Sequence, residues 1–265
     1  MTDGPGPLVA VVTGAASGIG HAFVRALARR GYACVGADID ETALAALAIE
    51  VEPSRWLGVR TDVANATDVE RLADLTFAQF GRVDLLINNA GILATGRSWE
   101  MPLAKWRQVL DVNLLGPVNA VHSFVPRLIA QGRGHVVNVA SAAALAAHAH
   151  TAAYAASKHG LLALSESLAR ELEAMGSPVR VSVVFPGAVK TGIARDLNAD
   201  AAAVALPINR LLADLATKGA EPDDVVAQVL SAVESNTFAV FPQAQVRDRA
   251  SERLRALLDG KLPGA

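Results

Sequence analysis

Cysteine is almost absent from this chain. Of the 265 residues only Cys34 is a cysteine, so no disulfide can form within one chain, and we expect a reducing compartment, the cytoplasm. Cys34 lies in the apolar run 32–36, which predicts a small buried strand side chain rather than a nucleophile. Residues 1–7 lack both the basic start and the apolar stretch of a signal peptide, so we expect no secretion.

Long apolar runs and an excess of basic charge are missing too. No stretch of about 18 apolar residues is free of a charge, Asn, His or Gly, so we expect no membrane span. Lysine and arginine number 24 against 26 acidic residues, and the net charge of −2 offers no basic surface for nucleic acid or an anionic membrane. No metal site is expected. With 52% hydrophobic residues the chain is typical of a globular protein, and we expect one domain over residues 1–265.

What the chain does contain is a regular alternation of short valine-rich runs and longer helical patterns. The runs predict strands buried on both faces, and the alternation predicts an α/β fold: a parallel sheet with helices on both sides. The predicted strands cover 8–13, 33–38, 56–60, 84–88, 135–140, 180–185 and 238–241. The predicted helices cover 19–30, 41–50, 66–80, 103–130, 152–175 and 222–235.

A glycine-rich turn directly follows the first predicted strand. It reads Thr13-Gly-Ala-Ala-Ser-Gly-Ile-Gly20 and opens a helix, so its glycines let the backbone turn tightly and approach a diphosphate. An NTPase loop would end in Gly-Lys-Ser/Thr, whereas this turn ends in Gly-Ile-Gly, which argues against nucleotide hydrolysis. The turn therefore predicts a dinucleotide site.

Asp38 ends the second predicted strand. A carboxylate there accepts hydrogen bonds from the adenosine ribose hydroxyls and repels a 2′-phosphate. Neither Ser17 nor Ile39 supplies a positive charge nearby, so we expect NAD(H) to be favoured over NADP(H). The alternative is that Asp38 only caps the helix that starts near Asp40.

Tyr154 and Lys158 are four residues apart, so both side chains leave one face of a predicted helix. A free tyrosine has a pKa near 10, too high for acid–base work at neutral pH. A neighbouring ammonium favours the phenolate and lowers that pKa. The pair therefore predicts a tyrosine that can serve as a general acid or base.

These residues resemble the short-chain dehydrogenase/reductase family over nearly the whole chain. The resemblance implies a Rossmann-type doubly wound domain with a seven-stranded, mostly parallel sheet in the order 3-2-1-4-5-6-7. It also implies contacts to the cofactor from Asp38 and from separated motifs that match in the family's order. The motif residues are Gly14, Ser17, Gly18, Ile19 and Gly20; Asp62 and Val63; Asn88, Ala90 and Gly91; Tyr154 and Lys158; and Pro186, Gly187, Val189 and Thr191.

The same resemblance implies four catalytic residues. Ser141 would donate a hydrogen bond to the substrate oxygen, and Tyr154 would take a proton from an alcohol or give one to a ketone. Lys158 would lower the tyrosine pKa and bind the nicotinamide ribose, while Asn113 would hold a water that links Lys158 to solvent. Several motif residues have a structural alternative: Ser141 could cap a turn, Asn113 could satisfy helix backbone groups, and Asn88 and Asn89 could brace neighbouring strands. Many family members carry a second serine where this chain has Ala140.

The substrate side is expected to form from residues 142–150 and from the insertion 189–219, which breaks the strand–helix rhythm. Such an insertion is typical of a lid, although a surface excursion without a role is the alternative. We expect an apolar pocket. His148 or His150 would reach a polar group of the substrate, or both are ordinary loop histidines. Arg195 and Arg210 would anchor a carboxylate or phosphate, or both are solvated at the surface. The expected apolar residues are Ala142, Ala143, Leu145, Ile193, Leu197 and Leu206.

We therefore expect an oxidoreductase that transfers a hydride between NAD(H) and a hydrophobic secondary alcohol or ketone. The alternatives are a reductase of 3-oxoacyl thioesters and a catalytically silent dinucleotide sensor or scaffold. The resemblance implies a homotetramer or homodimer paired through helices 103–130 and 152–175. The amphipathic pattern 245–258 predicts a further helix that packs on its own subunit or a neighbour; the alternative is a helix at a membrane surface.

Overall fold

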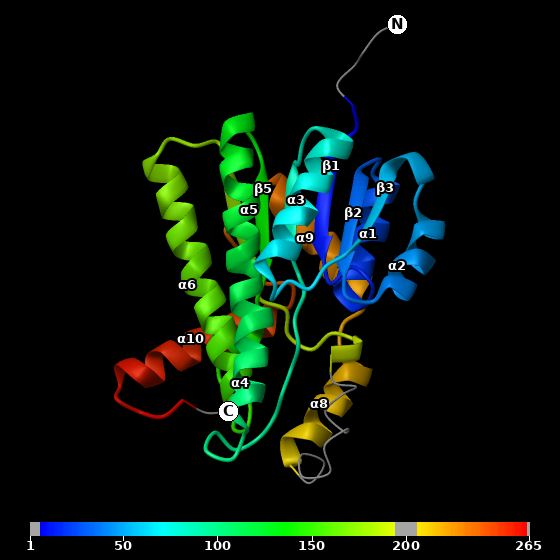
Figure 1. Cartoon of the computed structure of the whole chain (residues 1–265). Coiled ribbons are helices and arrows are strands. Elements are labelled where there is room, and N and C mark those ends of the chain that lie inside the picture. The colour runs from blue at the N-terminus through cyan, green and yellow to red at the C-terminus, as the bar shows by residue number, and fades with distance from the viewer. Residues whose placement is uncertain (1–5, 194–205, 264–265) are drawn as a thin grey trace, which may run out of the picture.

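The computed structural model describes residues 6–193 and 206–263 and has a parallel sheet at its centre (Figure 1). Its seven strands lie in the order β3-β2-β1-β4-β5-β6-β7, which confirms the predicted order. The strands are β1 Val9–Thr13, β2 Ala33–Asp38, β3 Trp56–Arg60, β4 Leu85–Asn88, β5 His135–Val139, β6 Arg180–Val184 and β7 Ala239–Val240.

The central strands are buried on both faces because helices cover both. Every residue of β1, β4 and β5 is buried, as the valine-rich runs predict. The prediction is wrong for β3, where Gly58 and Arg60 are exposed. This strand lies at the edge of the sheet, and only Val59 is fully buried in it.

The helices form two layers. α1, α2 and α9 share one apolar cluster with one face of the sheet, and α3, α5 and α6 share a second cluster with the other face. In Figure 1 the second layer lies in front of the sheet. The bounds of these six helices are α1 Gly18–Arg29, α2 Glu41–Leu47, α3 Ala66–Phe80, α5 Gly116–Gln131, α6 Ala152–Ala174 and α9 Pro222–Glu234.

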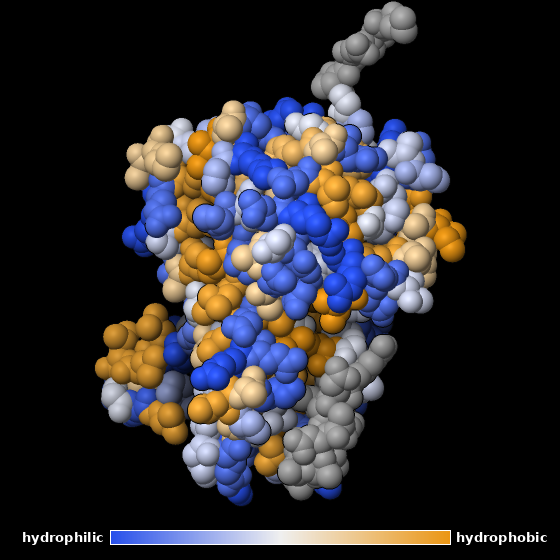
Figure 2. All heavy atoms as spheres, in the orientation of Figure 1, coloured by the Kyte–Doolittle hydropathy of each residue, from blue (hydrophilic) through white to orange (hydrophobic). Residues whose placement is uncertain are grey.

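Three further helices lie near the carboxyl ends of the strands, at the bottom of Figure 1: α4 Leu103–Leu110, α8 Pro207–Lys218 and α10 Ala244–Leu258. α10 carries apolar side chains at its outer end, and Figure 2 shows them gathered on the surface there. They are Leu254, Leu257 and Leu258, followed by Leu262. In the parts of the chain that the structure describes, no helix is long and apolar enough to cross a membrane.

The predicted helix 103–130 is divided in the structure. A π-helical turn, Asp111–Leu115, separates α4 from α5. Pro117 has no backbone N–H, so it cannot donate the α-helical bond to the carbonyl of Asn113. That missing bond is a physical reason for the wider turn, and π turns of this kind are frequent at functional sites.

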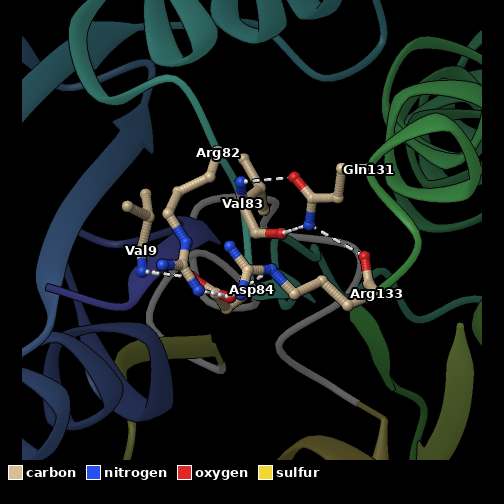
Figure 3. Close-up of polar contacts among 6 residues, drawn as sticks. All are labelled: Val9, Arg82, Val83, Asp84, Gln131 and Arg133. Atoms are coloured by element: carbon tan, nitrogen blue, oxygen red, sulfur yellow. Dashed lines mark hydrogen bonds and ion pairs between the residues drawn. The ribbon is translucent and has the colours of Figure 1, made fainter. Parts of the chain in front are cut away.

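The amino ends of the strands, far from α8 and α10, are joined by polar side chains (Figure 3). Asp84, just before β4, accepts the Val9 backbone N–H at 2.8 Å and pairs with the Arg82 guanidinium. Arg133 Nε lies 3.6 Å from the same carboxylate. Gln131 bonds both the N–H and the carbonyl of Val83. These contacts tie β1 and β4 to the end of α5.

Candidate active site

A large cavity opens at the carboxyl ends of the strands. Its volume is about 1320 Å³, which exceeds that of an ordinary small-molecule pocket and leaves room for a dinucleotide with a second ligand. Its walls come from the glycine turn, from the segments that follow β2, β4, β5 and β6, and from α6, α8 and α10. In open α/β sheets this edge is where ligands bind.

The glycine turn is shaped for close backbone approach. Gly14 and Gly18 have φ of +63° and +53°, where a side chain is strained. A Cβ on Gly14 would lie 2.8 Å from Ala90 Cα, and one on Gly20 would lie 2.0 Å from the Gly14 oxygen. Asn89 holds the turn from β4 by donating to the carbonyls of Thr13 and Gly14. A backbone without side chains here fits a diphosphate against the start of α1.

Most of the predicted cofactor residues line this cavity. They are Gly14, Ser17, Gly18, Ile19, Asp38, Asp62, Val63, Ala90, Gly91, Tyr154, Lys158, Pro186, Gly187, Val189 and Thr191. Gly20 lies behind the turn, because it packs against the Gly14 carbonyl. Asn88 does not line the cavity. Its side chain donates to Asn138 at 2.8 Å and so braces β4 against β5, as its structural alternative predicts. Asn89, one residue on, lines the cavity and was not among the predicted cofactor residues.

The carboxylate of Asp38 supports the turn from β2. Its oxygens accept the Ala16 N–H at 3.0 Å and the Asp40 N–H at 3.1 Å. The cap of α2 is Asp40, whose side chain accepts the Ala43 N–H, so capping does not account for Asp38. Ile39 follows it in the lining, 64% exposed and without charge. This corner of the cavity therefore presents an acid and an apolar side chain.

Asn113 occupies the centre of the π turn and is fully buried. Its Oδ1 accepts the Ile92 N–H at 2.8 Å, and its Nδ2 donates to the Ile92 carbonyl and to Ser157 Oγ. Asn113 thus satisfies the backbone groups of Ile92, which lies in the loop after β4 and not in a helix, so the helix-backbone alternative is not what the structure has. The same oxygen also lies 3.4 Å from the position of a Cβ on Gly91, and Lys158 Nζ lies 3.5 Å from that position. The missing side chain of Gly91 leaves the space between the two polar groups open.

Ser141 follows β5 and begins a short 3₁₀ turn, Ala142–Ala144. Its Oγ accepts the Ala143 N–H at 3.1 Å, so it does cap a turn. A hydroxyl has one proton to donate besides. That proton is left for Tyr154, with which Ser141 interacts, or for a ligand oxygen.

Tyr154 and Lys158 both face the cavity from α6. Lys158 Nζ lies 5.8 Å from the centroid of the Tyr154 ring and donates to the Val139 carbonyl at 2.9 Å. Burial lowers the pKa of Lys158 to about 8. Burial also raises the pKa of Tyr154, and the hydrogen bond with Ser141 acts in the opposite direction. The spacing predicted a lowered pKa for Tyr154, and the protein alone does not have it. Desolvation of the phenolate outweighs the hydrogen bond with Ser141.

The segment after β6 is held by α10. Gln243, which precedes that helix, accepts the Gly187 N–H at 2.9 Å and donates to the Ala188 carbonyl. Thr191 lies against the glycine turn, since a Cβ on Gly18 would be 3.0 Å from its Cγ2. The two ends of the expected cofactor site are therefore in contact.

The substrate side of the cavity is largely apolar. Of the expected residues, Ala142, Ala143, Leu145 and Ile193 line it, Leu206 does not, and Leu197 lies outside the described residues. The insertion 189–219 contributes one face of α8 in addition. That face consists of Ile208, Leu211, Leu212, Leu215 and Ala216.

Of the polar residues expected near the substrate, some line the cavity and others do not. His148 lines the cavity, whereas His150 does not and holds a left-handed backbone at φ +68°. Arg210 is exposed and outside the lining, and Arg195 lies outside the described residues. Arg107, Asp111 and Arg249 line the cavity without having been predicted, as do their neighbours on α4 and α10.

Comparisons with known proteins identify relatives of this chain. A sequence profile described as short chain dehydrogenase matches residues 8–202. The chain is 40% identical to 1-deoxy-11-beta-hydroxypentalenate dehydrogenase of Streptomyces exfoliatus, over 92% of this chain and 86% of that one. It is 39% identical to cis-4-hydroxycyclohexanecarboxylate dehydrogenase of Sinomonas cyclohexanicum, over 77% and 83% of the two chains.

A solved structure is also similar. The short chain dehydrogenase/reductase from Burkholderia phymatum, in complex with NAD, superposes with a TM-score of 0.91 at 33% identity and covers 98% of this chain and 97% of that one. The fold and the nucleotide-binding edge define an oxidoreductase of Rossmann type. The chain belongs to the short-chain dehydrogenase/reductase family.

Proposed function

We propose that the protein is an NAD(H)-dependent dehydrogenase that interconverts a secondary alcohol on a bulky apolar, alicyclic skeleton and the matching ketone. One observation carries the proposal: Ser141, Tyr154 and Lys158 share one wall of a cavity whose substrate side is apolar. The relatives named above act on a hydroxypentalenate and a hydroxycyclohexanecarboxylate, both cyclic hydroxy compounds. An apolar wall of alanine, leucine and isoleucine suits such a ring.

Asp38 supports the choice of NAD(H). Its carboxylate lies beside the glycine turn and would receive the ribose hydroxyls, whereas a 2′-phosphate would meet a like charge. The described cavity lining has three cationic residues, Arg107, Lys158 and Arg249, and none of them follows β2. The similar structure that contains NAD points the same way.

The protein's own residues perform the proton chemistry in this proposal. Tyr154 removes the hydroxyl proton as the alcohol is oxidised, and Ser141 donates a hydrogen bond to the same oxygen. The nicotinamide, when bound, accepts the hydride. Because burial raises the pKa of Tyr154 in the protein alone, the phenolate needs a cation close to it, and Lys158 is the cation at this wall. The proton then leaves past Gly91, through the space between Lys158 and Asn113.

Two other functions from the sequence fit less well. A 3-oxoacyl thioester reductase would use NADPH as a rule, and Asp38 opposes its 2′-phosphate. A silent dinucleotide sensor has no need of a proton donor, a proton acceptor and an open apolar cavity together. The alicyclic alcohol dehydrogenase accounts for all three features.

The deciding experiment measures reduction of NAD and of NADP with a panel of secondary alcohols: substituted cyclohexanols, terpene alcohols, steroids and 3-hydroxyacyl thioesters. We expect NADH formation with cyclic alcohols and a higher kcat/KM for NAD than for NADP. Preference for NADP together with turnover of thioesters alone would establish the reductase instead. NADH binding without turnover of any member would establish the sensor.

We further propose a cytoplasmic homodimer or homotetramer. Support comes from apolar side chains that are exposed on the described surface of one subunit, where a second copy would cover them. Leu115 and Val118 lie at the start of α5, and Met175 follows α6, as pairing through these helices requires. Light scattering that gives the mass of one chain at micromolar concentration would contradict the assembly.

A further inference from the structure

α10 turns one face to the substrate side of the cavity. The lining residues on this helix are Gln245, Val246, Arg249 and Ala250. Positions four apart lie on one side of a helix, so Gln245 with Arg249 and Val246 with Ala250 form a continuous strip. Arg247 leaves the helix in another direction, where its guanidinium lies 5.4 Å from the centre of the Phe241 ring. Of the arginines on α10, only Arg249 lines the cavity.

The strip is anchored beside the expected reaction centre. Val246 is buried in a small apolar cluster with Ala140, directly before Ser141, and Ala144, three residues after it. Its Cγ2 also lies 3.2 Å from the position of a Cβ on Gly187. Arg249 follows Val246 by about one turn, lines the same cavity and is exposed to solvent, as a residue at the mouth of the cavity would be.

Arg249 has no ionic partner of its own. Among the residues that the structure describes, no carboxylate lies within ion-pair distance of it and no hydrogen bond uses its guanidinium. Glu252 is one turn further along α10, yet the two do not pair. Other arginines of this protein do have such partners: Arg25 pairs with Asp223, for example.

The other charges of the cavity make Arg249 distinctive. In the described lining the acids are Asp38 and Asp62 on the adenosine side and Asp111 on the π turn. Arg107 likewise forms no ion pair with a described residue, but Asp111, four residues later, lines the same cavity as a nearby acid. Lys158 already donates to the Val139 carbonyl. Besides Lys158, Arg249 is therefore the cation of the described lining with no acid of its own helix in the cavity wall.

We propose that Arg249 binds a carboxylate of the substrate, so that the preferred substrate is a cyclic hydroxy acid rather than a neutral alcohol. This inference rests on the proposed function and adds a charged group to its substrate. The hydroxyl would lie at Tyr154 and Ser141, the ring against the apolar wall, and the carboxylate at the mouth, where it stays partly hydrated. A guanidinium suits this task because it can donate two parallel hydrogen bonds to a carboxylate.

The first test measures binding rather than turnover. Cyclohexanecarboxylate and the neutral cyclohexanecarboxamide are titrated into the NADH-loaded protein by calorimetry, with wild type, Arg249→Met, Arg249→Lys and Arg255→Met. Arg255 is exposed on the same helix and does not line the cavity, so it is the matched control. We expect Arg249→Met to weaken binding of the carboxylate roughly 10- to 100-fold, as loss of a charge-assisted hydrogen bond does. Binding of the amide should change less than about twofold.

The second test uses kinetics with 2-, 3- and 4-hydroxycyclohexanecarboxylates and their methyl esters. The wild type should favour the best acid over its ester, and Arg249→Met should remove that preference mainly through KM. Arg249→Lys should retain part of it, and Arg255→Met all of it. Equal weakening of acid and ester, or a raised KM for NAD, would assign Arg249 a structural or cofactor role and overturn the inference. Oxidation of the esters with no preference for acids would do the same and leave the proposed function standing.

Discussion

The two ends of the same parallel sheet use polar side chains in opposite ways. At the amino end, Asp84 accepts the Val9 N–H and pairs with Arg82 and Arg133, so its oxygens are taken by the protein itself (Figure 3). At the carboxyl end, Ser141 and Lys158 each use part of their bonding capacity on the backbone and keep the rest for the cavity. The comparison teaches that satisfied polar groups hold strands together, while partly satisfied ones are available to a ligand.

This difference makes the two ends separable by mutation. Substitutions at the amino end should alter the free energy of unfolding and leave catalysis unchanged. Substitutions at the carboxyl end should alter catalysis or cofactor choice and leave the fold intact. The four changes that follow, in order of decreasing effect, test that separation.

Tyr154→Phe should have the largest effect. It removes one hydroxyl from the carboxyl end, and with it the proton transfer, so we expect kcat to fall roughly a thousandfold. The ring that packs on α6 is unchanged, so NADH affinity and melting temperature should stay close to those of the wild type. Turnover assays measure kcat, and fluorescence titration measures the affinity for NADH. Activity within tenfold of the wild type would reject Tyr154 as the acid–base residue.

Asp84→Ala should have the largest effect at the amino end. It leaves the Arg82 and Arg133 guanidinium groups without their carboxylate and frees the Val9 N–H. Breaking a largely buried ion pair costs about 3 kcal/mol, which urea denaturation would measure. kcat/KM at 25 °C should not change. The control is Asp74→Ala, whose pair with Arg127 is mostly exposed and should contribute under about 1 kcal/mol. Equal losses in both variants would contradict the role of the Asp84 cluster.

The sequence predicts the sheet well because its signals are local and repeated. Valine-rich runs marked each central strand, and the family motifs fell on the loops that line the cavity. Contacts between distant segments were not predictable in the same way. Nothing local shows that Asn88 turns toward Asn138 while Asn89 turns toward the glycine turn. The absent N–H of Pro117 was a local signal for the π turn around Asn113, but the helical pattern obscured it.

The electrostatics of the site also needed the structure. The spacing of Tyr154 and Lys158 predicts that they are neighbours on α6, but it does not predict how deeply they are buried. Burial raises the pKa of Tyr154 and lowers that of Lys158 to about 8. Both shifts disfavour the charged form of the side chain, which is the form that catalysis needs. Likewise, the amphipathic pattern of α10 predicts a helix without telling which of its arginines faces the cavity.

His135 gives the amino end a dependence on pH. It is 7% exposed at the start of β5, bonds Ser182 at 2.8 Å, and burial holds its pKa at about 4, with Arg180 acting in the same direction. An unfolded histidine has a pKa near 6.5, so the unfolded chain binds the extra proton between these values. Stability from this residue is complete above about pH 6.5 and is lost as the pH falls toward about 4. At pH 5 the loss should be about 2 kcal/mol.

Urea denaturation at pH 7 and pH 5 measures this loss. His135→Gln, which cannot titrate, should reduce the difference between the two pH values by that amount. His122→Gln is the control, because His122 is exposed on α5 and its replacement should leave the difference as it is. The kcat at pH 7 should be the same in all three proteins, since His135 lies at the end of the sheet away from the cavity. An unchanged pH dependence in His135→Gln would show that another group is responsible.

Asp38→Ser should have the smallest effect, because it alters selectivity at the carboxyl end and not the reaction. The carboxylate accepts the Ala16 and Asp40 N–H groups, and a serine oxygen can retain part of that bonding. Removing the negative charge lowers the repulsion of a 2′-phosphate, so the preference for NAD over NADP should fall about tenfold, or about 1.4 kcal/mol. The ratio of kcat/KM for the two cofactors measures it. Each oxygen of Asp38 already accepts one backbone N–H, although the residue lies at the carboxyl end, so this variant is also the most exacting test of the comparison. A loss of stability as large as that of Asp84→Ala would show that bonding within the protein, and not the end of the sheet, decides what a residue does.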